Sequence, residues 1–146
     1  MQAGGRGNAA HWDWNHKRKA AALKADNVAF LALTEEEECH AMMLLLWPKT
    51  ARFANGELVY VDYLEVAPKD RHGPQVQRDV LGVGAAMIDV AVRVSCAEGL
   101  AGRIGLHSLP DAEAFYKKRG LKRGTRDAPE NLLYFEMVEG GEALCP

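Results

Sequence analysis

The chain has 146 residues, a length that suits one ordinary domain able to bury a core without disulfides or metals. Hydrophobic residues make up 48% of the sequence and charged residues 26%, proportions typical of a globular protein and not of a disordered one. The formal net charge of -2 gives no general electrostatic reason to bind nucleic acid or an anionic membrane.

We expect one domain over residues 1–146, with a disordered start over residues 1–10 and a loose tail over residues 139–146. No apolar run approaches the roughly 18 to 20 residues that cross a bilayer. The first residues also lack the apolar segment of a secretion signal, so we expect a cytoplasmic protein. The cysteines are odd in number and have no CxxC spacing, which predicts thiols and neither a disulfide framework nor a zinc site: Cys39, Cys96 and Cys145.

The chain begins with a predicted helix and a predicted hairpin. Strong helix formers and a capping aspartate predict a helix from Trp12 to about Ala25. Strands are expected over residues 28–34 and 39–47, and Pro48 is expected to end the second of them. The glutamates at 35–38 lie between these strands. Since consecutive carboxylates point in different directions, they predict a solvated hairpin tip and not a metal site.

A central strand is predicted next, over residues 58–66, after a turn at Asn55-Gly56. Both of its faces are largely apolar, which indicates a strand covered on both sides. The polar segment from Pro68 to Gln77 predicts a loop. The glycine pair Gly82 and Gly84 then opens a long apolar helix that ends near Glu98.

In the last third of the sequence we expect a strand over residues 103–107, a helix that starts at Ser108 with a reciprocal cap, and a final strand over residues 131–138. Gly120 ends the helix. The basic cluster that follows, from Lys117 to Arg123, is interpreted as a solvated face that complements the helix dipole. This order of elements predicts an α/β or α+β class with a mixed sheet.

A strand, a glycine turn and a helix together make a candidate anion cradle, because the first N–H groups of a helix have no partners of their own. The dinucleotide fingerprint G-x-G-x-x-G does not fit, since its third glycine position holds Met87. The phosphate loop G-x-x-x-x-G-K-[ST] does not fit either. Its Lys-Thr pair would be Lys49-Thr50, which follows Pro48 and not a glycine.

The remaining pattern resembles the GCN5-related N-acetyltransferase family. One motif is Tyr63-Leu64-Glu65-Val66-Ala67-Pro68, followed after a loop by Arg78-Asp79-Val80-Leu81-Gly82-Val83-Gly84-Ala85. A later motif, Ala114-Phe115-Tyr116-Lys117-Lys118-Arg119-Gly120-Leu121, is similar to the family's F-Y-x-x-x-G-F segment. The resemblance implies a central mixed, mostly antiparallel sheet flanked by helices. It also implies acetyl-CoA as co-substrate and no metal.

The resemblance assigns coenzyme contacts and an acid. The backbone of the central strand at Leu64 and Val66 would position the thioester and the pantetheine arm. The pyrophosphate would be held by the segment that corresponds to the family's [RQ]-x-x-G-x-[GA] motif, namely Arg78, Leu81, Gly82, Val83, Gly84 and Ala85. Asp79 stands where the family has Arg or Gln, one residue after the basic Arg78. Tyr116 matches the tyrosine near the coenzyme sulfur that often serves as general acid.

The general base is left open between three residues and a chain of water molecules that leads to solvent. Glu65 lies beside the thioester strand, His107 ends the next strand and carries the imidazole side chain that commonly serves as a base, and Asp62 lies one step of the pleat back. The implied reaction is direct acetyl transfer to a primary amine of a small molecule or peptide in a ternary complex. A non-catalytic acyl-CoA-binding or regulatory module is the alternative, and a toxin-like acetyltransferase acting on aminoacyl-tRNA is a weaker one. Exposed strand edges in such a sheet would allow a homodimer.

Overall fold

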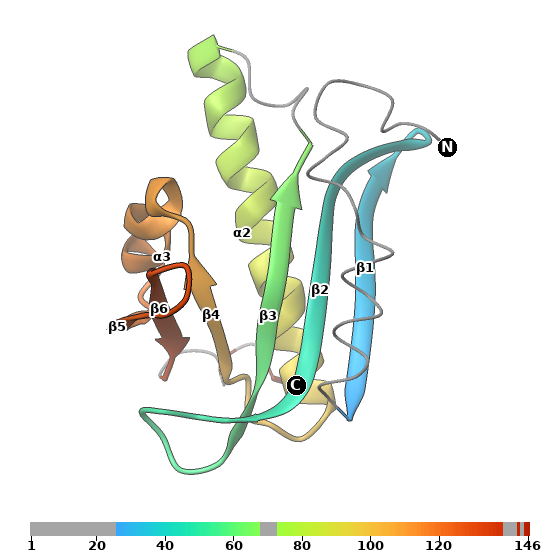
Figure 1. Ribbon diagram of the computed structural model, residues 1–146. Coiled ribbons are helices and arrows are strands. Elements are labelled where there is room, and N and C mark those ends of the chain that lie inside the picture. The colour runs from blue at the N-terminus through green and yellow to red at the C-terminus, as the bar shows by residue number, and fades with distance from the viewer. Residues whose placement is uncertain (1–25, 68–72, 139–142, 144) are drawn as a thin grey trace.

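The computed structural model describes residues 26–67, 73–138, 143, 145 and 146 (Figure 1). The helix expected from Trp12 to Ala25 and the disordered start expected over residues 1–10 lie outside these residues. The strands are β1 (Asn27–Glu35), β2 (Glu38–Thr50), β3 (Glu57–Val66), β4 (Ile104–Ser108), β5 (Lys122–Asp127) and β6 (Leu132–Met137). The helices are α2 (Gly73–Ala97), the short 3-10 helix η4 (Pro110–Ala112) and α3 (Glu113–Lys118).

The strands form one six-stranded sheet in the order β1-β2-β3-β4-β6-β5. Only β3 and β4 pair in parallel, and the other neighbours are antiparallel. The parallel pair is connected through α2, as a crossover connection requires. The expected mixed, mostly antiparallel sheet flanked by helices is therefore confirmed, with β3 in its interior as its apolar sequence predicted.

The hairpin of β1 and β2 forms as expected, and it is longer than the sequence indicated. Glu36 and Glu37 make its turn with φ values of 51° and 66°, and Glu35 pairs with Glu38. The prediction that Pro48 ends the second strand is wrong, because β2 continues to Thr50. An irregularity in the register with β3 lies between Leu46 and Lys49, and it accommodates a proline that has no N–H to donate.

Strand β3 contains a β-bulge at Asp62. Leu45 pairs with Val61 whereas Leu44 pairs with Tyr63, so Asp62 is an extra residue on β3. The bulge changes which face the following side chains occupy. Leu64 therefore packs with Val61 in the main core, although simple alternation assigns them to opposite faces.

Helix α2 lies across one face of the sheet behind β2 and β3, and α3 lies beside it (Figure 1). The buried apolar side chains of α2 are at most 3% exposed and pack on the sheet: Met87, Ile88, Ala91 and Val92. Arg119, the residue that follows α3, donates to Asp89 of α2 at 2.9 Å. A smaller cluster around Leu44 and Leu46 includes Tyr60 and Tyr63 and lies on the opposite face.

The start of α2 differs from the expectation. The segment from Pro68 to Gln77 was expected to be a loop, with the helix opening at Gly84, but α2 begins at Gly73. Pro74 is the second helical residue, where its missing N–H costs nothing. The Gly82 and Gly84 pair therefore lies inside the helix, where its N–H groups take part in the helical hydrogen-bond ladder.

The substitution Gly82→Ala tests this placement. A Cβ added at Gly82 meets no atom within 4 Å, and alanine is the better helix former. We expect the free energy of unfolding of the ligand-free protein to rise by about 0.5 to 1 kcal/mol. Urea denaturation measures the change. A loss of stability would instead indicate a non-helical backbone at Gly82, as a glycine loop requires.

A further expectation near α3 is wrong. Ser108 does not cap the following helix, since it belongs to β4 and its hydroxyl donates to the carbonyl of Leu109 at 2.7 Å. The residue before η4 is Leu109, and it makes no side-chain cap. The sequence pattern also does not predict β5. Its residues Lys122–Asp127 are polar and form the last strand of the sheet, so they lack the apolar alternation that reveals a half-buried strand.

The thiol prediction is wrong for two of the cysteines. Cys96, near the end of α2, and Cys145 form a disulfide with a Cα–Cα distance of 5.2 Å. Their sequence separation of 49 residues carries no sign of this proximity. Cys39 retains its thiol, which donates to the carbonyl of Ala41 at 3.5 Å. Among the described residues, no helix is both long enough and apolar enough to cross a membrane.

Candidate active site

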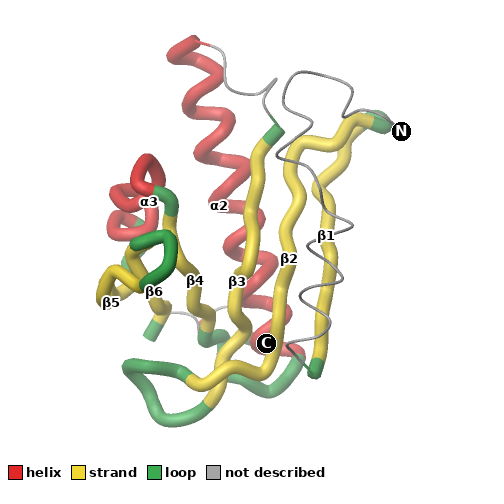
Figure 2. The backbone as a smooth tube through the Cα atoms, viewed as in Figure 1, coloured by secondary structure: helices red, strands yellow, loops and turns green. Residues whose placement is uncertain are grey.

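The two parallel strands β3 and β4 separate toward their C-terminal ends, as Figure 2 shows. Their pairing extends from Val59 with Ile104 to Val61 with Leu106, and β3 then continues to Val66. The β-bulge at Asp62 follows directly after the last paired residue, where it bends the strand. The two strands are therefore separated at the end of β4 that carries His107.

A cavity of about 150 Å³ lies at this separation. This is smaller than the roughly 300 to 1,000 Å³ of a site that encloses a whole drug-sized ligand. Side chains from both faces of the sheet line the cavity, with Leu106 from the face of α2 and His107 from the opposite face. The remaining lining residues are Val61, Asp62, Tyr63, Leu64, Ser108, Leu109, Ala112, Tyr116 and Leu132.

Tyr116 reaches the cavity from α3 and is only 7% exposed. Its ring packs against Phe115 at 5.1 Å and against Phe135 of β6 at 5.8 Å between centroids. Burial raises the pKa of Tyr116 to about 12. The phenol therefore holds its proton throughout the physiological range and can donate it to a group in the cavity.

An alkaline titration tests the environment of Tyr116. The folded-state pKa of about 12 lies above the ordinary value of about 10, so burial favours the neutral phenol. Its contribution to stability is complete below pH 10 and is lost as the pH rises from about 10 to 12. The tyrosinate absorbance of the protein minus that of Tyr116→Phe should titrate near pH 12, whereas a midpoint near 10 would show an exposed phenol.

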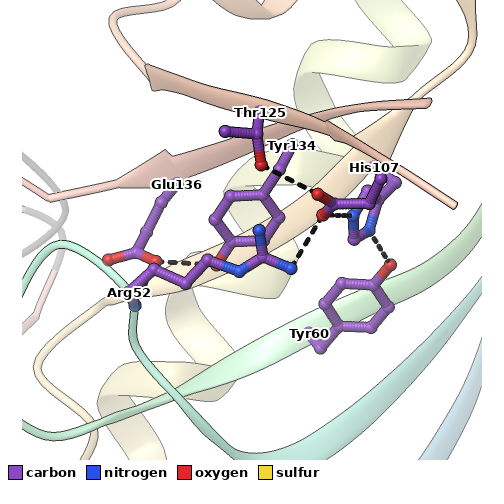
Figure 3. Close-up of polar contacts among 7 residues, drawn as sticks. Arg52, Tyr60, His107, Thr125, Tyr134 and Glu136 are labelled. Carbon is purple, nitrogen blue, oxygen red and sulfur yellow. Dashed lines mark hydrogen bonds and ion pairs between the residues drawn. The ribbon is translucent and has the colours of Figure 1, made fainter. Parts of the chain in front are cut away.

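His107 is held by a group on each ring nitrogen, on the sheet face opposite α2 (Figure 3). Its Nδ1 lies 2.5 Å from the Tyr60 hydroxyl, and its Nε2 lies 2.7 Å from Oδ2 of Asp127, at the end of β5. Burial raises the pKa of Tyr60, so this phenol is protonated and acts as a donor. His107 is thus oriented by two hydrogen bonds at the wall of the cavity.

Asp127 accepts hydrogen bonds on both of its oxygens. Oδ1 accepts from the Thr125 hydroxyl at 2.8 Å, and Oδ2 lies 2.8 Å from Nη2 of Arg52. The hydrogen bonds from His107, Thr125 and Arg52 hold the pKa of Asp127 well below its usual range. Asp127 and Arg52 are not among the predicted site residues, because no local spacing connects them to His107.

Glu136 of β6 anchors the segment that carries Arg52. Its carboxylate is fully buried and accepts from the backbone N–H groups of Arg52 at 2.8 Å and Phe53 at 3.0 Å. The Tyr134 hydroxyl donates to the same group at 2.7 Å, and the Arg52 guanidinium lies 3.9 Å from the centre of the Tyr134 ring (Figure 3). In the sequence, the only indication of this role is that Glu136 is a charged residue within the otherwise apolar strand β6.

The predicted site residues fall into different places. His107, Tyr116, Asp62 and Leu64 meet at the cavity, whereas Glu65 and Val66 lie farther along β3 and are not among its lining residues. The predicted pyrophosphate contacts remain a prediction. Their backbone is helical here, and they lie in α2: Arg78, Leu81, Gly82, Val83, Gly84 and Ala85. Within the described ranges, no group of three or more histidine, cysteine or carboxylate side chains is arranged to hold a metal ion.

Comparisons with known proteins show the fold. No protein-family model and no curated protein matches the sequence. Among solved structures, the chain is similar to one in a KacTA–DNA complex, with 18% identity, a TM-score of 0.56, and coverage of 94% of this chain and 83% of that chain. It is similar to AtaTR bound with AcCoA, with 17% identity, a TM-score of 0.53 and coverage of 96% and 83%.

A third structure is described as an acyl-CoA N-acyltransferase from Pseudomonas aeruginosa. It shares 15% identity with this chain and has a TM-score of 0.53, over 77% of this chain and 68% of that chain. The similarity agrees with the mixed sheet, its one parallel pair and the helices on one face. The chain has the fold of the GCN5-related N-acetyltransferases.

Proposed function

We propose that this protein is an acetyl-CoA-dependent N-acetyltransferase that transfers the acetyl group directly to a primary amine. The observation that carries the proposal is the cavity at the separation of β3 and β4, where Tyr116 and His107 meet from different elements. Its volume of about 150 Å³ suits the reacting thioester and amine, with the rest of the coenzyme outside. The AcCoA bound to a protein of the same fold supports the choice of acetyl donor.

Transfer from a thioester to an amine requires a base for the amine proton and an acid for the departing thiolate. The amine nitrogen forms a bond with the acetyl carbon, and the carbon–sulfur bond breaks. Tyr116 donates its proton to the sulfur, since its raised pKa keeps it protonated. His107 takes up the amine proton, with Asp62 as the second candidate base at the cavity and Glu65 more remote.

The coenzyme contacts are also part of the proposal. The backbone of β3 at Leu64 and Val66 would hold the thioester end of the coenzyme. The pyrophosphate would be held by Arg78 and the segment from Leu81 to Ala85. That segment is helical in the structure, so binding through its N–H groups would require the first turns of α2 to open.

An acceptor panel tests the proposal. Acetyl-CoA is incubated with the protein and with small amines, polyamines, peptides with free N-termini or lysines, and aminoacyl-tRNA, and mass spectrometry detects the acetylated product. We expect turnover with at least one amine class. Saturable acetyl-CoA binding without any product would support the non-catalytic acyl-CoA-binding module instead. Absence of both binding and product would contradict the proposed function.

A further inference from the structure

The hydrogen bonds around His107 define which of its nitrogens carries the proton. Asp127 receives donors on both oxygens, and its depressed pKa keeps it ionised, so this carboxylate can only accept. At 2.7 Å from Oδ2, Nε2 of His107 must therefore be the protonated nitrogen. In a neutral imidazole the other nitrogen, Nδ1, then has a lone pair.

The second partner of the ring agrees with this assignment. Tyr60 has a raised pKa, caused chiefly by its burial, and its hydroxyl can donate to Nδ1 at 2.5 Å. A donor on Nδ1 and an ionised acceptor on Nε2 are compatible with only one neutral tautomer. The other tautomer would place the Nε2 lone pair against a carboxylate oxygen at 2.7 Å, which is repulsive.

We propose that Asp127, held by Arg52, is a positioning residue that fixes His107 as its Nε2–H tautomer and keeps its basic lone pair on Nδ1. The Tyr60 hydroxyl donates to that lone pair at rest, so Nδ1 can take up a proton only when this hydroxyl turns away. The role in catalysis rests on the proposed function, whereas the tautomer does not. Arg52 contacts the same Oδ2 atom at 2.8 Å. This contact holds the carboxylate in place and balances its charge.

Arg52 is itself held in place by two residues of β6, Glu136 and Tyr134. Its backbone N–H donates to the fully buried Glu136, and its guanidinium lies over the Tyr134 ring, so the connection between β2 and β3 is fixed on β6. The side chain of Asp127 is 26% exposed and that of Arg52 is 43% exposed. A solvent-exposed ion pair alone contributes little to stability, so we infer that the pair serves orientation.

Nitrogen-15 NMR of the histidine rings at mildly alkaline pH tests the assignment without any substrate. The His107 signals are identified by their loss in His107→Asn. In the unaltered chain we expect Nε2 to be protonated and Nδ1 not. In Asp127→Asn the amide can donate to Nε2, so we expect the Nδ1–H tautomer to become the major form.

Two variants serve as controls for that measurement. Tyr60→Phe removes the donor to Nδ1 but keeps the acceptor at Nε2, so the Nε2–H tautomer should persist. Glu113→Gln removes another ion-paired carboxylate, 2.8 Å from Arg126, and should leave the His107 signals unchanged. An unaltered chain with protonated Nδ1, or an Asp127→Asn chain that keeps Nε2–H, would overturn the proposal.

Steady-state kinetics link the tautomer to transfer. If the protein acetylates an amine, Asp127→Asn should lower kcat by about 10²-fold or more, with a nearly unchanged KM for acetyl-CoA. A failure of the proposed function and a failure of the positioning role would give different results. The expected tautomers in a chain without transfer would contradict only the proposed function, whereas active transfer with an unchanged kcat in Asp127→Asn would contradict only the positioning role.

Discussion

The substitution Tyr116→Phe should lower kcat for acetyl transfer by about 10²-fold or more, the usual contribution of a general acid. Phenylalanine keeps the ring that packs on Phe115 and Phe135, so only the proton donor is lost. The dissociation constant for acetyl-CoA should remain nearly unchanged, because the hydroxyl acts on the thiolate that forms during the reaction. Stopped-flow single-turnover kinetics, which isolate the chemical step, and calorimetric titration measure the two quantities.

Tyr63→Phe is the matched control for that experiment. It removes the phenol hydroxyl of another residue that lines the same cavity, and the ring again remains. Its effect on kcat should be much smaller than that of Tyr116→Phe. Equal losses in the two variants, or an unchanged rate in Tyr116→Phe, would remove Tyr116 from the mechanism.

The substitution Glu136→Leu should cause the largest loss of stability among changes outside the apolar core. It deprives the N–H groups of Arg52 and Phe53 and the hydroxyl of Tyr134 of their acceptor. Each unsatisfied buried donor costs about 1 to 3 kcal/mol, and part of this is recovered where water enters. We expect the free energy of unfolding to fall by about 2 to 4 kcal/mol, measured by urea denaturation.

Two variants make the Glu136 experiment specific. Glu136→Gln keeps one carbonyl acceptor and should lose less stability than Glu136→Leu. Glu113→Gln removes a carboxylate that forms an exposed pair with Arg126 and should cost much less stability than Glu136→Leu. If Glu136→Leu were no more destabilising than Glu113→Gln, the buried carboxylate would not be the anchor of the connection between β2 and β3.

Much of the sheet could be predicted because its strands are strongly apolar. The segments over residues 28–34, 39–47 and 58–66 predicted β1, β2 and β3, and the turn at Glu36 and Glu37 followed from a run of charges. The strand β5 could not be found in this way. It is a polar strand at the edge of the sheet, and its pairing with β6 depends on backbone hydrogen bonds that any sequence can make.

The start of α2 could not be predicted from the sequence, because Gly73-Pro74 is compatible with two local structures. The dipeptide is typical of a turn, but proline is also favoured in the first turn of a helix. The structure shows the second case, with α2 beginning at Gly73. This difference matters for the site, because Gly82 and Gly84, which match the family's pyrophosphate motif, lie inside a helix. Gly82→Ala tests that placement.

The candidate site was predictable where a motif marks it and not elsewhere. Tyr116 was found through the segment around it, and His107 through its place at a strand end. Asp127, Arg52 and Glu136 come from separate parts of the chain. The antiparallel pairing of β6 with β4 and β5 brings Asp127 and Glu136 near His107, and the hydrogen bond from the Arg52 backbone N–H to Glu136 holds Arg52 there. The β-bulge at Asp62 was also hidden, because it arises from the register between β2 and β3.

The most direct test is NMR of the protein with acetyl-CoA labelled with carbon-13 in its acetyl methyl group. The account predicts saturable binding of one molecule per chain, with nuclear Overhauser contacts from that methyl group to the ring protons of Tyr116 and His107. These contacts would place the thioester in the cavity between β3 and β4. A lack of saturable binding, or contacts of the methyl group with another part of the protein, would contradict the account.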